Sequence, residues 1–347
     1  MLVDSPPEQR AETAPAPPTR RAIRAIGLLG SVVILVLVAL ASIAIGAKAL
    51  SMGQVWHGLF QDTGTYGDVV VADRLSRTVL GLLAGAALGL SGAVLQALTR
   101  NPLADPGLLG INAGASAAVV TAITFFGVTS LSGYVWFAFV GAAAVGALVW
   151  FLGGSRGATP VRLALAGTAI SAALYGYLQA VMIMDDAALA RMRFWTVGSL
   201  ASASNSAILQ VLPFLAVGTV LALSLARPLN AMEMGDDTAK ALGANLNLTR
   251  ALAMLSATVL CGAATAACGP IMFVGLMVPH VVRSFTGPDL RWILPYATVL
   301  SPVLLLGADV LGRVVARPSE LQVGIVTAII GGPVFIYLVR RRRTAQL

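Results

Sequence analysis

Long apolar runs that contain no Asp, Glu, Lys or Arg alternate along the chain with short charged segments. Because about 20 apolar residues cross a bilayer as a helix, each run is long enough for one or two transmembrane helices. Ten crossings account for the runs and leave no room for a separate soluble domain. The pattern therefore predicts an all-α polytopic membrane protein. The uncharged runs are residues 25–47, 78–99, 106–155, 163–184, 194–226, 251–282, 292–308 and 321–339.

Two of the longer runs contain internal turn signals. Residues 106–155 can form a helical hairpin with its turn at residues 130–134, which read Ser-Leu-Ser-Gly-Tyr. In a later run, Gly269 and Pro270 should break the helix, because proline lacks a backbone donor and clashes with the preceding turn. We expect one full span before this break and a short span after it that ends near Val278.

The run over residues 194–226 begins with an amphipathic stretch, residues 194–204, that is rich in aromatic and small residues. This composition is typical of an interfacial or re-entrant segment. We expect the segment to precede a span over residues 207–225.

Composition and charge strengthen the membrane assignment. Of the 347 residues, 57% are hydrophobic and 11% are charged, whereas a soluble domain carries about 25% charged residues. A water-soluble fold is therefore excluded. The net charge of +8 comes from short basic clusters between the runs, such as residues 20–24 and 340–343, which indicates topology and not nucleic-acid binding. By the positive-inside rule, both termini are predicted to be cytoplasmic.

The same reasoning assigns the first residues and one short loop. Residues 1–22 are rich in Pro and Ala, lack periodicity and are predicted to be a disordered cytoplasmic tail. A ten-span domain should follow over residues 23–343. The loop that carries Arg156 and Arg162 falls inside by the topology count, and these two arginines are predicted to serve orientation only.

The chain carries no recognisable energy source for active transport. Ion coupling needs ionisable groups inside the membrane, but the uncharged runs contain no carboxylate, and Asp309 lies at the edge of one run. Both lysines, Lys48 and Lys240, are followed by Ala, so no phosphate-binding loop exists. If the chain belongs to a pump, we expect another chain to hydrolyse ATP.

Catalytic and metal sites are not indicated either. His57 and His280 have no Cys, Glu or His at ligand spacing, and no nucleophile is paired with a base. His280 follows Pro279 at a predicted cytoplasmic helix end, where it would cap carbonyl groups or brace a turn. We predict no catalytic residue and no directly bound metal or cofactor.

Glycines recur at regular spacing in the second span, at Gly81, Gly85 and Gly89. This small-xxx-small spacing lets helix backbones approach closely. We favour packing inside one subunit over a subunit interface.

One sizeable polar segment, residues 227–250, interrupts the apolar pattern. It lies inside by count and can form two short helices joined at Gly243. Asp236 and Asp237 would then lie near the first N-terminus, where the helix dipole favours acidic side chains. The segment is either a solvated loop or a docking surface for a partner protein.

A set of sequence blocks carries a family resemblance: residues 74–77, 85–96, 100–111, 235–245, 269–283, 307–313 and 320–333. These blocks resemble the FecCD-type permeases of ABC importers, which take up iron-siderophores, haem and vitamin B12. They follow one another in family order over residues 25–343. Two departures occur: Ser76 stands where the family commonly has Pro, and residues 287–291 lack a His often found before the Arg.

The resemblance implies a type II ABC importer permease fold with ten spans in the bacterial cytoplasmic membrane. It also implies a second permease subunit, identical or paralogous, two ATP-binding subunits that hydrolyse ATP, and an extracytoplasmic substrate-binding protein. An iron-siderophore is the expected cargo, with haem or vitamin B12 as alternatives. An ion-coupled secondary transporter and a lipid-modifying membrane enzyme are the other classes considered, and neither finds its required polar residues here.

The resemblance further assigns coupling and structural positions. The family's coupling helices lie in the loop over residues 229–249, which we expect to dock in a groove of the ATPase. The expected coupling residues are Gly235, Asp236, Asp237, Ala241, Leu242 and Gly243, and the structural motif positions are Asn101, Pro102, Gly269, Pro270, Pro279 and His280.

Three arginines fall on the outer side by the topology count: Arg74, Arg77 and Arg313. In family members that import vitamin B12, matching arginines receive acidic residues of the binding protein, a task that suits a guanidinium because it can grip a carboxylate through two hydrogen bonds. We expect these arginines to dock the binding protein. Snorkelling, or local pairing with Asp73 or Asp309, is the alternative.

Overall fold

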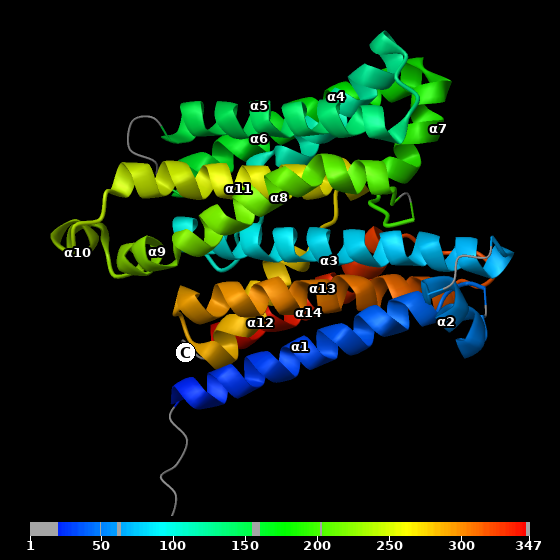
Figure 1. Cartoon of the computed structure of the whole chain (residues 1–347). Helices are drawn as coiled ribbons and strands as arrows, with labels where there is room; N and C mark the ends of the chain where they lie inside the picture. The colour runs from blue at the N-terminus through cyan, green and yellow to red at the C-terminus, as the bar shows by residue number, and fades with distance from the viewer. Residues whose placement is uncertain (1–19, 49, 61–63, 155–159, 202, 345–347) are drawn as a thin grey trace, which may run out of the picture.

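The computed structural model describes residues 20–48, 50–60, 64–154, 160–201 and 203–344. These residues form α-helices and one short 3₁₀ helix, η1, and contain no strand. Most of the helices lie side by side along one direction (Figure 1). The elements are α1 (Arg20–Ala44), α2 (Met52–Phe60), α3 (Tyr66–Thr99), η1 (Pro106–Leu109), α4 (Ile111–Phe126), α5 (Leu131–Gly154), α6 (Pro160–Met184), α7 (Asp186–Trp195), α8 (Asn205–Ser224), α9 (Ala226–Glu233), α10 (Asp236–Ala241), α11 (Leu246–Cys268), α12 (Val274–Thr286), α13 (Leu290–Val315) and α14 (Val323–Thr344).

Each of the ten predicted spans has a helix at its expected place. Within the described chain, α1, α3, α5, α6, α8, α11 and α13 are long and apolar enough to cross a membrane. Helices α4 and α14 contain shorter apolar stretches, and α12 follows the predicted break. The all-α, multi-span prediction is confirmed. The predicted tail lies outside the described residues up to residue 19, and α1 already includes residues 20–22.

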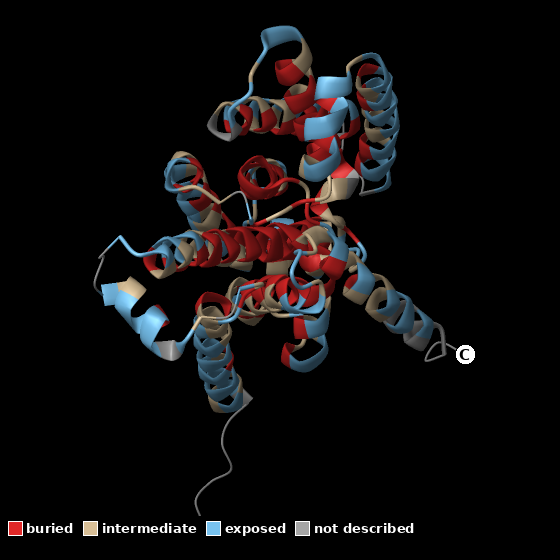
Figure 2. Ribbon diagram, turned by 90° about the vertical axis from the view of Figure 1, so that its right-hand side faces the viewer, coloured by how far each residue is buried: buried red, intermediate tan, exposed pale blue. Residues whose placement is uncertain are grey.

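Helix α3 is the buried centre of the bundle because its glycines let α13 approach. In the most apolar stretch of α3, 78% of the residues are buried. The buried residues of the whole chain gather in the middle of the molecule (Figure 2). A Cβ on Gly85 would stand 2.6 Å from the Cα of Pro302, and a Cβ on Gly89 would overlap the hydroxyl of Ser301. Both neighbours belong to α13. The glycine spacing therefore serves packing inside one chain, as expected.

The predicted break between α11 and α12 is present. Gly269 ends α11 with φ of +74°, and a Cβ there would overlap the carbonyl oxygen of Trp195. The following residues up to Phe273, which is left-handed, are not helical. Non-helical backbone at membrane depth is tolerated only where protein covers it. Gly269 and Ile271 are buried in the bundle, whereas Met272 is 57% exposed.

Helix α12 continues further than predicted. It passes through Pro279 to Thr286, so His280 lies inside the helix, and the predicted helix end near this residue is wrong. Proline cannot donate to the carbonyl group of Gly275, four residues earlier. Gln96 on α3 supplies a donor instead, because its Nε2 lies 3.4 Å from the Gly275 oxygen and 3.0 Å from the next carbonyl oxygen. The Gln96 side chain thus replaces the donor that Pro279 lacks, and α12 continues through this proline.

The segment between α7 and α8 folds back onto two other elements. Its first two predicted residues are the last residues of α7, and the residues described between Thr196 and Ser204 are not helical. The amide of Ser199 donates to the carbonyl oxygen of Cys268 at 2.8 Å, and the amide of Gly324 donates to that of Gly198 at 3.2 Å. These bonds fix the segment between the end of α11 and the start of α14.

Candidate functional site

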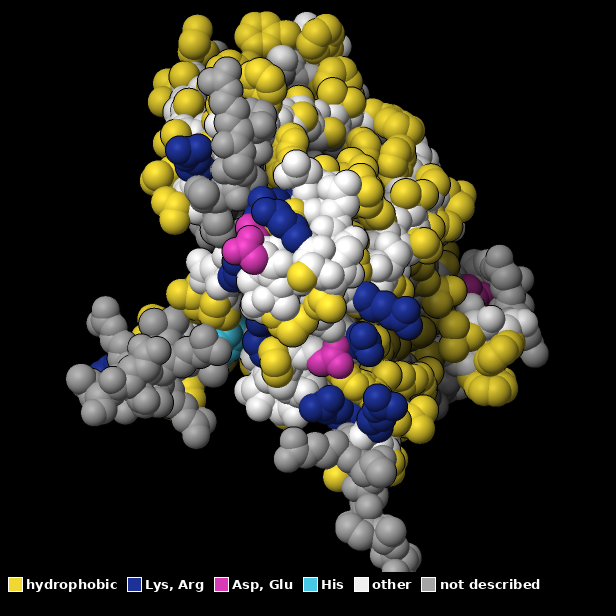
Figure 3. All heavy atoms as spheres, turned by 90° about the vertical axis from the view of Figure 1, so that its left-hand side faces the viewer, with side chains coloured by type: hydrophobic (Ala, Val, Ile, Leu, Met, Phe, Trp, Pro, Cys, Tyr) yellow, Lys and Arg dark blue, Asp and Glu magenta, His cyan; other side chains and the backbone are white. Residues whose placement is uncertain are grey.

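Charged residues gather at both ends of the helix bundle. Helices α9 and α10 lie at the end where α1 begins and α14 finishes, which is the predicted cytoplasmic end (Figure 1). Lys and Arg side chains are prominent on this end of the molecule (Figure 3). The arginines expected to dock the binding protein lie at the other end, near the start of α3 and the end of α13.

The polar segment forms a short helical cap, residues 226–245, made of α9, α10 and the turn that follows. Its two short helices are joined at Gly235, not at Gly243 as predicted. Gly235 has φ of +111°, a conformation that L side chains rarely adopt, and therefore bends the chain sharply between α9 and α10. Gly243, with φ of +81°, ends α10 instead, where its amide donates to the carbonyl oxygen of Lys240 at 2.9 Å.

Asp236 ties the cap to two spans. Its carboxylate accepts hydrogen bonds from Arg100, the residue that caps α3, and from Arg250 on α11 at 2.6 Å. Desolvation is the largest single influence and raises its pKa, but the two guanidinium groups together outweigh desolvation, so the pKa of Asp236 is lowered. The carboxylate is therefore a charged anchor at neutral pH. Asp237, next to it, is fully exposed and lies 3.9 Å from Lys240.

Helix α9 is tied to α12 and α13 in a similar way. Arg283 on α12 pairs with Glu233 at 3.1 Å. Asn230 donates to the Asp289 carboxylate at 2.6 Å, and its own side-chain oxygen accepts from the amide of Leu290 at 2.9 Å. The cap thus has polar connections to four of the spans.

Apolar side chains are exposed on the cap. Met234 and Leu242, which flank α10, are 60% and 64% exposed, and Ala241 and Gly243 are exposed as well. Exposed apolar residues on an otherwise polar segment favour a protein contact over a solvated loop.

The loop after α3 lies beside the cap and contains the predicted Asn101–Pro102 motif. The side-chain oxygen of Asn101 accepts from the amide of Leu103 at 3.0 Å, and the Asp105 carboxylate accepts from the amide of Gly107 at 2.7 Å, which caps η1. Desolvation raises the pKa of Asp105 to about 6, and the hydrogen bond from Gly107 offsets part of this effect. These contacts build a defined turn at the predicted cytoplasmic end.

At the opposite end, Arg77 and Arg313 share one buried carboxylate. Arg77 donates to Asp309 through Nε and through a terminal nitrogen at 2.7 Å, and it also pairs with Glu320 at 2.6 Å. Arg313 lies 3.0 Å from the other oxygen of Asp309. Asp309 is fully buried, so the cluster joins α3, α13 and the segment before α14 inside the protein.

The same arginines cap the end of α1. The last carbonyl groups of a helix lack partners within it and carry partial negative charge. Arg74 donates to the carbonyl oxygens of Ile43 and Ala44, at 3.1 and 2.9 Å, and to that of Lys48 at 2.5 Å. Arg313 donates to the carbonyl oxygen of Ser42 at 3.0 Å. We call these arginines, with Arg77 and Asp309, the arginine clamp.

The three arginines that we expect to dock the binding protein are buried in this chain. Arg74, Arg77 and Arg313 are 7%, 9% and 1% exposed, and all three have hydrogen-bond partners inside the chain. An acidic residue of a binding protein would compete with Asp309 and Glu320 for Arg77, and with carbonyl oxygens for Arg74. The alternative of local pairing with Asp309 is what the structure contains. The spacing of Asp309 and Arg313, four residues apart on one helix, was the available signal.

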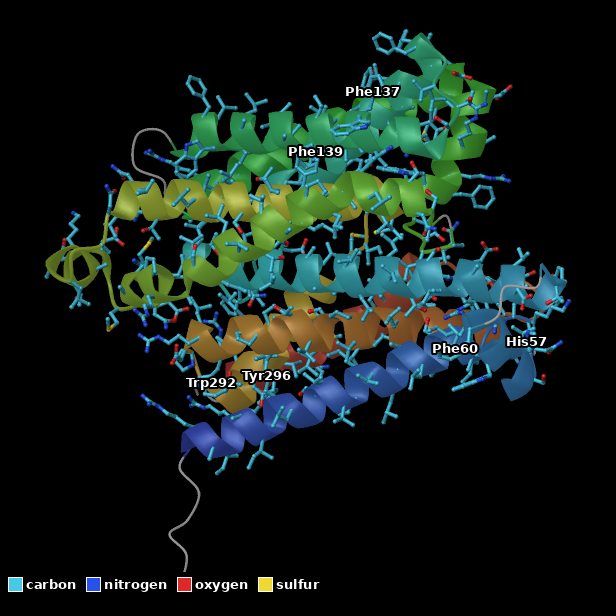
Figure 4. The ribbon with its side chains drawn as sticks, viewed as in Figure 1. His57, Phe60, Phe137, Phe139, Trp292 and Tyr296 are labelled. Atoms are coloured by element: carbon cyan, nitrogen blue, oxygen red, sulfur yellow. The ribbon has the colours of Figure 1, made fainter. Side chains whose placement is uncertain are left out.

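The histidines show no metal-binding arrangement. His57 lies on α2 at the predicted outer end (Figure 4), whereas His280 lies within α12. Within the described residues, no group of three His, Cys, Asp or Glu side chains could hold a metal ion.

The fold and its ends together define a class of protein: a polytopic permease whose spans meet a helical cap at one end. Comparison with known families agrees, since the FecCD transport family model matches residues 34–341. The chain belongs to the FecCD transport family and is a multi-pass permease of the inner membrane.

Related proteins and a solved structure extend this assignment. The chain is 45% identical over 323 residues to the ferric enterobactin transport system permease protein FepD of Escherichia coli (strain K12), covering 92% of this chain and 96% of FepD. It is 38% identical to the hemin transport system permease protein HmuU of Yersinia pestis, covering 90% and 94%. A metal-chelate type ABC transporter solved in an inward-facing conformation matches with a TM-score of 0.80 and 29% identity, covering 91% of this chain and 99% of that one.

Proposed function

We propose that this chain is the permease subunit of an ATP-driven importer that carries a ferric siderophore into the cytoplasm. The observation that carries the proposal is the 45% identity to a ferric enterobactin permease over 92% of the chain. Haem import is the second candidate, because a hemin permease is 38% identical over 90% of the chain. The larger identity favours the siderophore.

We assign the helical cap as the element of the permease that docks on the ATPase. Its exposed Met234 and Leu242 suit a groove on a partner, and its ion pairs through Asp236 and Glu233 transmit a displacement of the cap to the spans. ATP hydrolysis then belongs to two separate subunits, since this sequence has no phosphate-binding loop. The complete importer contains a second permease subunit and an extracytoplasmic binding protein.

The distribution of charge supports the orientation that we propose. Arg100, Arg250 and Arg283 lie at the end that carries the cap, and positive charge is enriched on the cytoplasmic side of membrane proteins. This distribution supports the proposal that both termini and the cap face the cytoplasm. The arginine clamp is then buried within the outer end of the bundle.

Uptake by the reconstituted importer tests the proposal. Proteoliposomes that hold the permease, the ATPase and the binding protein should accumulate iron from radiolabelled ferric enterobactin when ATP is supplied, and collapse of the proton gradient should leave the rate unchanged. An ATPase variant that cannot bind ATP is the control. Accumulation of haem but not of the ferric siderophore would replace the proposed cargo. Uptake that follows the proton gradient without ATP would contradict ATP-driven import.

A further inference from the structure

A cavity of about 440 Å³ opens at the predicted outer end of the bundle, apart from the arginine clamp. Arg191, Phe194 and Trp195 at the end of α7 form one side of it. Tyr134 on α5, Ser199 in the folded-back segment and Gln322 before α14 contribute further lining. Its size is within the range of about 300 to 1,000 Å³ that ligand sites commonly have.

Several hydrogen-bond donors line this cavity and bind no other group among the described residues. Among the described residues, the guanidinium of Arg191, the indole N–H of Trp195 and the amide side chain of Gln322 have no hydrogen-bond partner. The hydroxyl oxygen of Ser199 accepts from the amide of Ala201 at 3.1 Å, which leaves its hydrogen available. Unused donors around one cavity favour a ligand with several acceptor oxygens.

The charge of the lining selects an anion. Arg191 is the only charged residue among the residues that line the cavity, and none of them is acidic. Asp185, at the start of α7, attracts Arg191 electrostatically but forms no salt bridge with it. Its carboxylate instead accepts hydrogen bonds from the amides of Ala187 and Ala188 and from the Thr124 hydroxyl. A guanidinium without a paired carboxylate attracts a ligand that brings its own negative charge.

The walls also suit flat rings. Phe194 and Trp195 are neighbours on α7, and Tyr134 faces the same cavity, with its hydroxyl held by the carbonyl oxygen of Thr129 at 3.1 Å. Aromatic side chains pack against other rings in offset or edge-to-face geometry. The lining therefore combines one cation, several donors and three aromatic rings.

We infer that this cavity is a subsite for an anionic ferric chelate with aromatic oxygen-donor groups, in which Arg191 recognises the charge and the rings pack against the chelate. The inference rests on the proposed import function and deepens it, because it names the chemical class of cargo. A ferric catecholate has both properties. A neutral ferric trihydroxamate has acceptor oxygens but neither the charge nor the rings.

Direct binding tests the subsite without requiring transport. The permease–ATPase complex in nanodiscs, without binding protein, is dialysed against radiolabelled ferric enterobactin and against a neutral ferric trihydroxamate. Arg191→Ala should weaken binding of ferric enterobactin about tenfold through loss of charge-assisted hydrogen bonds. Arg191→Lys should lie between, because ammonium is a point charge without the planar fork. Binding of the trihydroxamate should change less than about twofold.

Arg193→Ala is the matched control. Arg193 lies on the same helix, two residues away, with its guanidinium 4.6 Å from the Phe194 ring, but it does not line the cavity. Its replacement should alter ferric enterobactin binding less than about twofold. Three results would overturn the subsite: no binding of ferric enterobactin by the wild-type complex, equal losses for Arg191→Ala and Arg193→Ala, or equal losses for both chelates. Failure of the proposed function would appear separately, as absence of uptake by the complete wild-type importer.

Discussion

At the residue scale, the arginine clamp explains why three cations lie at the predicted outer end against the positive-inside trend. Asp309 is fully buried and bonded to two guanidinium groups, so its charge is compensated on both oxygens. Arginine suits this position because one planar group donates in several directions at once. Arg74 donates in this way to three carbonyl oxygens, two in the last turn of α1 and one, that of Lys48, beyond its end. These arginines connect α3 and α13 to each other and to the end of α1.

Replacing Asp309 by Asn should destabilise the protein severely. The change leaves Arg77 and Arg313 buried beside a neutral group, and removal of one partner of a buried ion pair costs about 3 to 5 kcal/mol. Thermal unfolding of the purified permease in detergent measures this loss. Glu320→Gln is the control, because the Glu320 side chain is 34% exposed, and loss of such an exposed pair costs about 1 kcal/mol or less. Equal losses for the two variants would show that the buried carboxylate does not hold the clamp.

At the scale of elements, the cap is short and depends on its contacts with the spans. Helix α10 is only one to two turns long, and isolated helices of that length are unstable in water. Its position is set by Asp236 between Arg100 and Arg250 and by the two glycines that bound it. A helix held in this way can move with α3 and α11 when a partner displaces it.

Asp236→Asn should uncouple the cap more strongly than Asp237→Asn. Both variants remove one negative charge at the same helix end, but only Asp236 is bound by Arg100 and Arg250. We expect Asp236→Asn to lower substrate-stimulated ATP hydrolysis at least fivefold, which corresponds to about 1 kcal/mol, and Asp237→Asn to lower it less than twofold. The measurement is ATPase activity of the reconstituted importer with and without loaded binding protein. A greater loss from Asp237→Asn would mean that α10 acts through its exposed face and not through its anchors.

At the scale of the whole molecule, α3 links the two ends. It has 34 residues and is about 51 Å long at 1.5 Å per residue. Its first half carries Arg74 and Arg77, and the residue that caps it, Arg100, holds the cap. Helices α1 and α6 are much less buried than α3. In the most apolar stretch of each, only 17% of the residues are buried within this chain. Their exposed faces are available to lipid and to other subunits.

Topology at this scale depends on many charges together, so a single one should be dispensable. Arg162 lies at the start of α6, while Arg156 falls outside the described residues. We expect Arg162→Ala to keep uptake within about twofold and to leave the orientation unchanged, because loop charges are largely redundant. Uptake and the accessibility of a cysteine introduced near the C-terminus measure the two effects. Loss of uptake in a correctly oriented protein would reveal a contact that orientation does not explain.

The sequence by itself determined the features that follow from local pattern. The spacing of apolar runs gave ten helices because each crossing needs a fixed length of apolar chain. Gly269 and Pro270 marked the break because their backbone limits act wherever they occur. Residues 227–250 identified the cap because their charged and polar side chains are unsuited to the membrane.

Only the tertiary structure decided which polar groups meet. Gln96 lies on a different helix from Pro279 and supplies the donor that prolongs α12, and Arg77 is 232 positions away from Asp309 along the chain. The burial of the predicted docking arginines, and the donors collected around Arg191, likewise depend on helices that are distant in sequence. Sequence pattern reports the preference of each segment for membrane or water. Pairing between segments is set by their packing, and neither charge nor periodicity within one segment encodes it.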